Sequence, residues 1–489
     1  MIRGLPIPVV ITHNPGPGNG PLDDQRPVRL PPQNPREGQS SDMTQAKLPS
    51  LATSRPLRLF AFTSFYVAQG LPIGLITVAM PAWLAASGAS ASEVASFVAI
   101  TTLPWGFKLF AGPMMDRFRF PALGGRRPWV MLAQTGLLIS LLVLTLVGGT
   151  SAEVAFLTWS CFVINSFAAV QDVAVDGMAI DILPEDERGR ANALMAFGQV
   201  AGYAGAGALC GWLLVRYGVS VTAGAMAAGV AAILVLVTLL RERDGEKLLP
   251  WTAGGVQHQE HLHATSWKAI GVNLTRVLIL PMSLLLMLVT VCWRLSDGIF
   301  ITAIPVVLTQ EFGWSSNDYS TWYANSSFVA ALCGVLLGPF IDRHGARKFF
   351  IAGFLACSVS YLVLAMMADG WDQPRVWIIG MFAVNFSIQI VFVAFIALHM
   401  SICWPKVAAT QFAIYMAWSN LCRSFGAKAY GEMSPFLEAG QETLIMAGLS
   451  LTGAVLLVFV RLDRHRERLE RLHVREPAED ALADVPARF

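Results

Sequence analysis

The sequence has little charge and lacks the motifs by which many chains bind ATP or a catalytic metal. Only 14% of its 489 residues are Asp, Glu, Lys or Arg, whereas soluble domains carry about 25%. No Gly-Lys dipeptide occurs, which excludes a Walker A phosphate loop. The absence of a His-Glu-x-x-His segment argues against a metalloprotease. The composition is therefore not that of a soluble domain, and the sequence offers no Walker-type site for ATP.

Cysteine is also sparse and unpatterned. The seven cysteines are scattered singly, without a Cys-x-x-Cys pair, and all fall within hydrophobic segments. This pattern predicts reduced, packed thiols rather than a disulfide framework. The His-rich stretch 258–263 has no matching set of metal ligands nearby. We therefore expect no metal and no other cofactor.

What the sequence does contain is long apolar runs, since 54% of its residues are hydrophobic. A helix needs about 20 apolar residues to cross a hydrocarbon core of about 30 Å. Twelve segments have this character, so we predict an all-α integral membrane protein that has the lipid bilayer as its partner. The predicted crossings are 57–85, 92–114, 129–149, 153–182, 188–215, 218–240, 277–308, 318–341, 348–368, 375–401, 407–432 and 440–462.

The distribution of basic residues predicts the orientation of these crossings. The connections after the second, sixth and eighth crossings are rich in Lys and Arg, whereas the connections on the other face hold only Arg216 and Arg375. Short loops rich in Lys and Arg stay on the cytoplasmic side of a membrane. We therefore expect a multi-pass protein of the inner membrane with both termini in the cytoplasm.

The chain divides into two six-crossing halves, 57–240 and 277–462, on either side of a cytoplasmic central loop at 241–276. A charged cytoplasmic tail, 463–489, follows the second half. Segment 1–56 precedes the first half. Ten of its first 50 residues are proline and none of its apolar runs resembles a signal-peptide core, so we expect a disordered cytoplasmic tail. The position of Met43 just before the first crossing leads to the hypothesis that translation starts there rather than at Met1.

One motif occurs once in each half. Residues 112–117 read Gly-Pro-Met-Met-Asp-Arg, and residues 338–343 read Gly-Pro-Phe-Ile-Asp-Arg; a basic cluster follows each within ten residues. A motif repeated at the same helix end in both halves indicates a duplicated membrane architecture, and such an architecture favours solute transport. We expect these loops to act as gates, through Gly112, Asp116, Arg117, Arg126, Arg127, Gly338, Asp342, Arg343 and Arg347.

Further segments resemble a known family. The segments are Gln-Gly-Leu-Pro at 69–72, Phe-Lys at 107–108, Gln-Asp at 171–172, Asp-Ile-Leu-Pro-Glu-Asp-Glu-Arg-Gly at 181–189, Arg-Leu-Ser-Asp at 294–297 and Ala-Thr-Gln-Phe-Ala at 409–413. Together with the repeated motif, they resemble the major facilitator superfamily over roughly 57–460, and within it the AmpG muropeptide permeases and related acetyl-CoA transporters. At 294–297 this chain departs from the Lys-Leu-Gly-Asp usual in those permeases. The resemblance implies two pseudo-symmetric halves with a solute site between them.

Charged residues inside the predicted crossings are the first candidates for that site, because a charge in a membrane span is energetically costly. Arg294 and Asp297 lie three apart in the seventh crossing, and Asp172 and Asp176 lie four apart on one face of the fourth. We expect Arg294 to bind an anionic group and the two aspartates to form a protonatable pair. The alternative for Arg294 and Asp297 is a local ion pair that only packs the helix. The alternative for the two aspartates is a solvated position near the end of their helix.

Other polar residues in the crossings are weaker candidates. Lys108 either extends to the membrane surface or pairs with Asp172 as a gate, and Arg423 is a second deep cation. Uncharged polar side chains more often join helices than bind ligands. The candidates of this kind are Tyr66, Gln69, Asn385 and Gln389.

Three functions follow from these observations. The first is a secondary transporter, not an enzyme, that uses a proton gradient to take up a muropeptide-like small-molecule solute. The second is a permease of the same family for a siderophore or another organic anion. The third is a membrane sensor or enzyme, for which the sequence offers neither a catalytic constellation nor an added domain. We expect a monomer that binds no nucleic acid.

Overall fold

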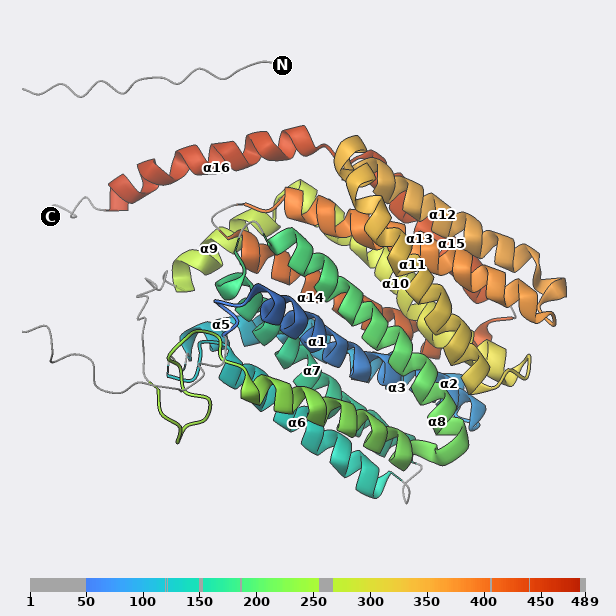
Figure 1. Cartoon of the computed structure of the whole chain (residues 1–489). Coiled ribbons are helices and arrows are strands. Elements are labelled where there is room, and N and C mark those ends of the chain that lie inside the picture. The colour runs from blue at the N-terminus through green and yellow to red at the C-terminus, as the bar shows by residue number, and fades with distance from the viewer. Residues whose placement is uncertain are drawn as a thin grey trace, which may run out of the picture. The chain divides into compact units, whose positions relative to one another are not determined.

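The computed structural model describes residues 50–118, 120, 122–148, 153–184, 187–254, 267–404, 407–438 and 440–483. These residues form a bundle of long helices (Figure 1). The helices of the first half are α1 (Arg55–Gly74), α2 (Met80–Ala86), α3 (Ala91–Thr102), α4 (Pro104–Phe107), α5 (Ala111–Arg117), α6 (Arg127–Val147), α7 (Val154–Ile182) and α8 (Arg188–Leu239). Those of the second half are α9 (Trp267–Leu278), α10 (Pro281–Gln310), α11 (Ser316–His344), α12 (Ala346–Met366), α13 (Pro374–Ser401), α14 (Ala408–Met433), α15 (Gln441–Val458) and α16 (Leu462–Ala483).

The twelve predicted crossings are confirmed, although they do not correspond one to one with helices. In the part of the chain that the structure describes, nine helices are long and apolar enough to cross a membrane. One of them, α8, supplies two crossings, because Gly218 adopts a φ of 76° that only glycine tolerates easily and thereby breaks the helix. The second crossing is assembled from α3, α4 and α5, which Pro104 interrupts, and α14 completes the set.

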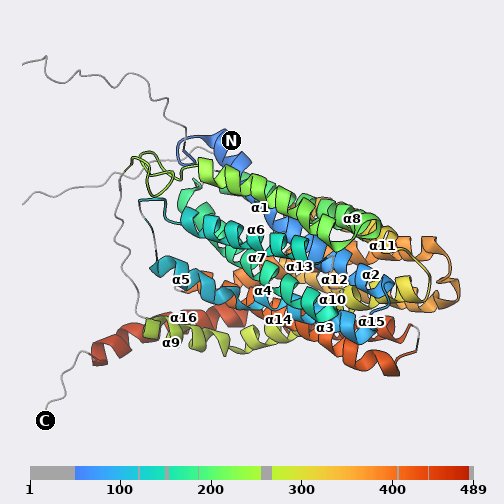
Figure 2. The same ribbon diagram turned by 90° about the horizontal axis from the view of Figure 1, so that it is seen from below.

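The two halves repeat the same packing. Helix α1 runs along α8 as α10 runs along α14, and α6 contacts α7 and α8 as α12 contacts α13 and α15. Figure 2 shows the same bundle from below, with α1 beside α8. The chain thus builds one arrangement twice, as the sequence repeat predicted.

Glycines allow the paired helices to cross in near backbone contact. A Cβ atom on Gly298 of α10 would come within 2.8 Å of the amide nitrogen of Ala427 and would overlap the Arg423 carbonyl, and one on Gly426 would overlap the Leu295 carbonyl. Gly70 of α1 faces α8 in the same way. Small residues at such crossings let backbones approach closely, which fixes the side chains beside them.

The halves are joined at the end of the bundle away from the Gly-Pro-x-x-Asp-Arg motifs. There the Gln310 amide of α10 donates to the carbonyls of Ala85 in α2 (3.0 Å) and of Ala89 in the loop after it (2.7 Å). Nearer the middle, the hydroxyl groups of Thr102 and Ser424 lie 2.7 Å apart. Among the described residues, the hydrogen bonds between the halves lie at that end or at mid-helix.

At the motif end, two of the predicted gating arginines hold each half together. The guanidinium of Arg127, at the start of α6, is 1% exposed and donates to the carbonyls of Val237 (2.9 Å) and Thr238 (2.6 Å) at the end of α8. Arg347, at the start of α12, donates to Leu457 (3.1 Å) and Val458 (2.7 Å) at the end of α15. Each arginine thereby satisfies carbonyls that a helix end leaves unpaired.

The other predicted gating residues differ from one another in their surroundings. Arg126 reaches Asp181 of α7 with its Nε at 3.4 Å, while Arg117 and Arg343 are exposed. Gly112 and Gly338 lie within α5 and α11. The side chains of Asp116 and Asp342 lie outside the part that the structure describes, so a gating role for this set stays a prediction.

The segment after α8 closes over the start of α6. Its Glu242 carboxylate accepts hydrogen bonds from the amides of Gly125 (3.0 Å), Arg126 (2.8 Å) and Arg127, and thus caps α6. Burial raises the pKa of Glu242, and it raises the pKa of Glu246 in the same segment to about 7.

Gly298→Ala should destabilise the protein by about 1–3 kcal/mol, because the added methyl group forces α10 and α14 apart. Gly448→Ala in α15, where an added methyl group would meet no atom within 4 Å, should have little effect or stabilise slightly. Thermal unfolding of the two purified variants checks this, and equal melting temperatures would contradict the packing described here.

The segment 241–253 should open more readily as the pH rises from about 4.5 to 7. The folded segment keeps the Glu246 proton up to about pH 7, whereas an exposed carboxyl releases it near its ordinary pKa of 4.5. Folding therefore loses stability across that interval. Hydrogen exchange at pH 5.5 and 8, corrected for chemical rates, should show this in the wild type. Glu246→Gln should lose the part of the pH dependence that Glu246 contributes and keep the part from Glu242, whose pKa is also raised; a variant that keeps all of it would refute the assignment.

Candidate functional site

A cavity of about 430 Å³ lies between the two halves near the middle of the bundle. It is lined by residues of both halves, among them aromatic side chains and six charged ones. Of the ten solute and coupling candidates predicted from the sequence, all but Gln69 line it. Those that line it are Tyr66, Lys108, Asp172, Asp176, Arg294, Asp297, Asn385, Gln389 and Arg423.

The charged residues of the first half form one connected cluster. Lys108 Nζ donates to Asp172 Oδ2 at 2.6 Å, and the Gln69 amide donates to Oδ1 of the same carboxylate. Gln69 thus does not line the cavity itself but orients Asp172, which does. The Tyr66 hydroxyl donates to Asp176. Because Asp172 and Asp176 lie one helical turn apart on α7, both carboxylates face α1 and the break in the second crossing.

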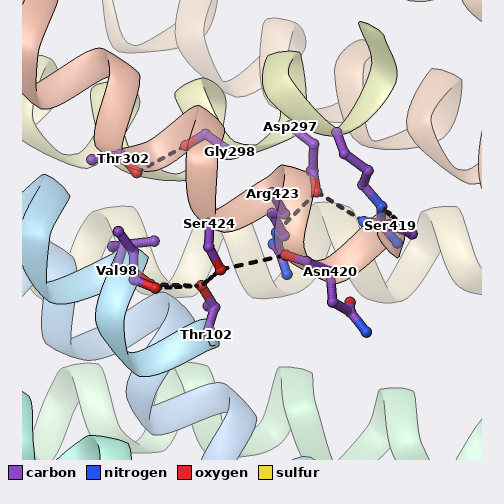
Figure 3. Close-up of polar contacts among 11 residues, drawn as sticks. Val98, Thr102, Asp297, Gly298, Thr302, Ser419, Asn420, Arg423 and Ser424 are labelled. Atoms are coloured by element: carbon purple, nitrogen blue, oxygen red, sulfur yellow. Dashed lines mark hydrogen bonds and ion pairs between the residues drawn. The ribbon is translucent and has the colours of Figure 1, made fainter. Parts of the chain in front are cut away.

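The charged residues of the second half form a separate cluster around Asp297 on α10. Asp297 Oδ2 accepts a hydrogen bond from Arg294 Nη1 at 3.0 Å. The same oxygen lies 2.9 Å from Arg423 Nε of α14 (Figure 3). The Arg423 N–H is not directed at this oxygen, so that contact is an ion pair without a formed hydrogen bond. Arg294 Nε also donates to Ser419 Oγ at 2.6 Å, and its guanidinium lies 3.9 Å from the Trp293 ring centre.

The two clusters carry opposite excess charge. In the first, one cation faces two carboxylates; in the second, two cations face one carboxylate. No ion pair joins one cluster to the other in the described part of the chain. The wall from the first half can therefore take up a proton or a cation, and the wall from the second half can take up an anion.

The repeat relates the two walls position by position. Tyr66 and Gln69 precede Gly70 in α1 with the same spacing that Arg294 and Asp297 have before Gly298 in α10. On the partner helices, Gln199 precedes Gly202 as Arg423 precedes Gly426. The first half therefore has neutral polar side chains where the second half has charged ones.

At another pair of related positions, the first half has the charged residue and the second half the neutral one. Counted from the repeated motif, Lys108 corresponds to Gly334 on α11. Lys108 contacts Asp172, and a Cβ atom on Gly334 would meet the Gln389 side chain of α13. Charges thus lie on the second and fourth crossings of one half and on the first and fifth crossings of the other.

Sequence reasoning missed several residues of the cavity. Gln199 could have been found from its spacing to Gly202, which matches that of Arg423 to Gly426. Ser419, which binds Arg294, has no such signal, because a serine in an apolar helix is common. The aromatic residues of the cavity wall also lack a sequence signal, since most aromatic residues in a membrane span face lipid or the protein core. These are Trp105, Trp293, Tyr203, Tyr323 and Phe392.

Neither a metal nor a disulfide belongs to this site as described. In the described ranges, no three His, Cys, Asp or Glu residues are placed to hold a metal ion. The stretch 258–263 lies outside those ranges. All seven cysteines are free, and five of them are buried.

Comparison with known proteins agrees with this architecture. Residues 60–427 and 286–484 match the family model of the Major Facilitator Superfamily. Over 405 residues, the chain is 25% identical to an anhydromuropeptide permease of Escherichia coli K12, covering 81% of this chain and 78% of that protein. Over 379 residues, it is 23% identical to a putative transporter, AmpG 4, of Rickettsia conorii, covering 75% and 87%.

Two solved structures share the fold. A D-xylose–proton symporter superposes with a TM-score of 0.61 at 14% identity, covering 81% of this chain and 97% of the other. The inward-open xylose transporter XylE of E. coli superposes with a TM-score of 0.61 at 15% identity, covering 82% and 96%. The resemblance predicted from the sequence is thereby confirmed. This chain is a multi-pass membrane protein of AmpG-like type and belongs to the Major Facilitator Superfamily.

Proposed function

We propose that this transporter takes up a muropeptide-like solute, an anhydro-amino-sugar peptide, across the inner membrane by proton-coupled alternating access. The observation that carries the proposal is the cavity between the halves, with its two separate charged clusters and aromatic walls. Polar groups in a largely apolar pocket orient a solute, while aromatic faces pack against its rings and methyl groups. The identity to the anhydromuropeptide permease supports the solute class.

The first-half cluster is the proposed proton site. Asp172 is engaged by Lys108 and Gln69, whereas Asp176 has only the Tyr66 hydroxyl among the residues that the structure describes. A proton on this pair would remove the excess negative charge of the first wall, which lowers the energy of closing the cavity around it. The pair would then couple proton movement to the conformational change.

The structure has the arrangement expected of one end state of that cycle. The halves are joined through Gln310 and through Thr102 with Ser424, away from the repeated motifs. The basic residues that flank those motifs favour a cytoplasmic location for the motif end. We propose that this is the inward-facing state, and that rocking of the two rigid halves exposes the cavity to the other side.

Purified protein in liposomes should accumulate a labelled anhydro-muropeptide when the outside is acidic, and a protonophore should collapse the accumulation. Asp297→Asn and Arg294→Ala should each lower uptake by about tenfold or more, because they remove charge-assisted hydrogen bonds at the site. Glu432→Gln, which alters an exposed ion pair with Lys428, is the matched control and should transport normally. Accumulation of a ferric siderophore instead of the muropeptide would reject the proposed solute.

Asp176→Asn should separate coupling from transport. The variant should still exchange labelled for unlabelled solute across liposomes without a gradient, because the second-half cluster is intact. It should lose most of the accumulation that a pH gradient drives, because the amide that replaces the carboxylate cannot take up the proton. Gradient-driven uptake at the wild-type level would place the proton site elsewhere.

A further inference from the structure

We infer that Arg423, and not Arg294, binds the solute, and that it binds a carboxylate group; Arg294 acts instead as a positioning residue. This inference rests on the proposed transport of an amino-sugar peptide and names the part of the solute that the second half recognises. It reverses the order in which the sequence ranks the two arginines.

The Arg294 guanidinium is already committed to the protein. Its Nε donates to Ser419, its Nη1 donates to Asp297, and one of its faces lies against the Trp293 ring. Its side chain is only 9% exposed. A guanidinium that is bound on two edges and one face holds its neighbours in place. It has few free N–H donors for a solute.

The Arg423 guanidinium is committed to the protein on one side only. It contacts Asp297 through Nε alone, and neither of its Nη groups forms a hydrogen bond with the described residues. Its side chain is 22% exposed and lines the cavity beside Tyr203 and Tyr323. Two terminal N–H groups on one planar fork match the two oxygens of a carboxylate.

The charge balance also requires an anion here. Asp297 supplies one negative charge to two arginines, so one positive charge in the second wall lacks a counter-charge. A desolvated charge without a partner is destabilising, and a solute carboxylate supplies the partner. The Asp297 contact holds Arg423 from its Nε side, which leaves the other edge of the fork for the solute. At the related position, the opposite wall has the neutral Gln199, which does not compete for the anion.

The test pairs two solutes with three variants. The probes are an anhydro-amino-sugar peptide with one free carboxylate and the same compound as its carboxamide; binding to purified protein is measured by calorimetry. The wild type should prefer the acid by about tenfold to a hundredfold. Arg423→Gln should bind both probes alike, and Arg423→Lys should retain part of the preference. Arg294→Gln should weaken both probes by the same factor and so retain the wild-type preference.

A second measurement does not depend on the identity of the solute. Phenylglyoxal, which modifies accessible guanidinium groups, should label Arg423 at least about tenfold faster than Arg294 in wild-type protein, as followed by mass spectrometry. If the wild type binds neither probe, the proposed solute is wrong, while the labelling result still decides the role of Arg423. The inference is overturned if Arg294 is labelled as fast as Arg423, or if Arg423→Gln keeps the preference for the acid.

Discussion

The interaction on which the site depends is the sharing of the Asp297 carboxylate between two arginines on two helices. It forms because Gly298 and Gly426 let α10 and α14 cross in near backbone contact, so that Arg423 reaches an oxygen already bound by Arg294. Removing one partner of a buried ion pair costs about 3–5 kcal/mol, since the other is left without compensation. The two arginines and the carboxylate therefore stay together. Their cluster nevertheless keeps one excess positive charge, which an anion can neutralise. That excess charge links the packing of two helices to the binding of a solute.

The duplicated architecture gives each half the same scaffold and a different chemistry. Arg127 and Arg347 bind carbonyls at the ends of α8 and α15, so that in each half the start of one helix is tied to the end of another. On that common frame, the halves carry their charges on different crossings. The first wall therefore has an excess of carboxylates and the second an excess of guanidinium groups. We propose that protons act on one wall and the solute on the other, and that both must be neutralised before the cavity closes.

Much of this could be predicted from the sequence, because it depends on local patterns. Apolar length predicted the crossings, and charge within them predicted which positions line the cavity. The break of α8 at Gly218 follows from one backbone angle, and the sequence shows it only as a short gap between two apolar runs. Which side chains pair could not be predicted, since the Arg423–Asp297 contact joins helices far apart in the chain. The sequence favours Arg294 as the residue that binds an anionic group, because its bond to Ser419 is not visible there.

The most direct test of this account is a structure of the protein with its solute bound. We predict that the solute occupies the cavity between the halves with a carboxylate within hydrogen-bond distance of the Arg423 Nη groups, while Arg294 keeps its bonds to Ser419 and Asp297. A solute whose anionic group lies on Lys108, or which leaves Arg423 uncontacted, would contradict the central claim that the second-half cluster is the anion site.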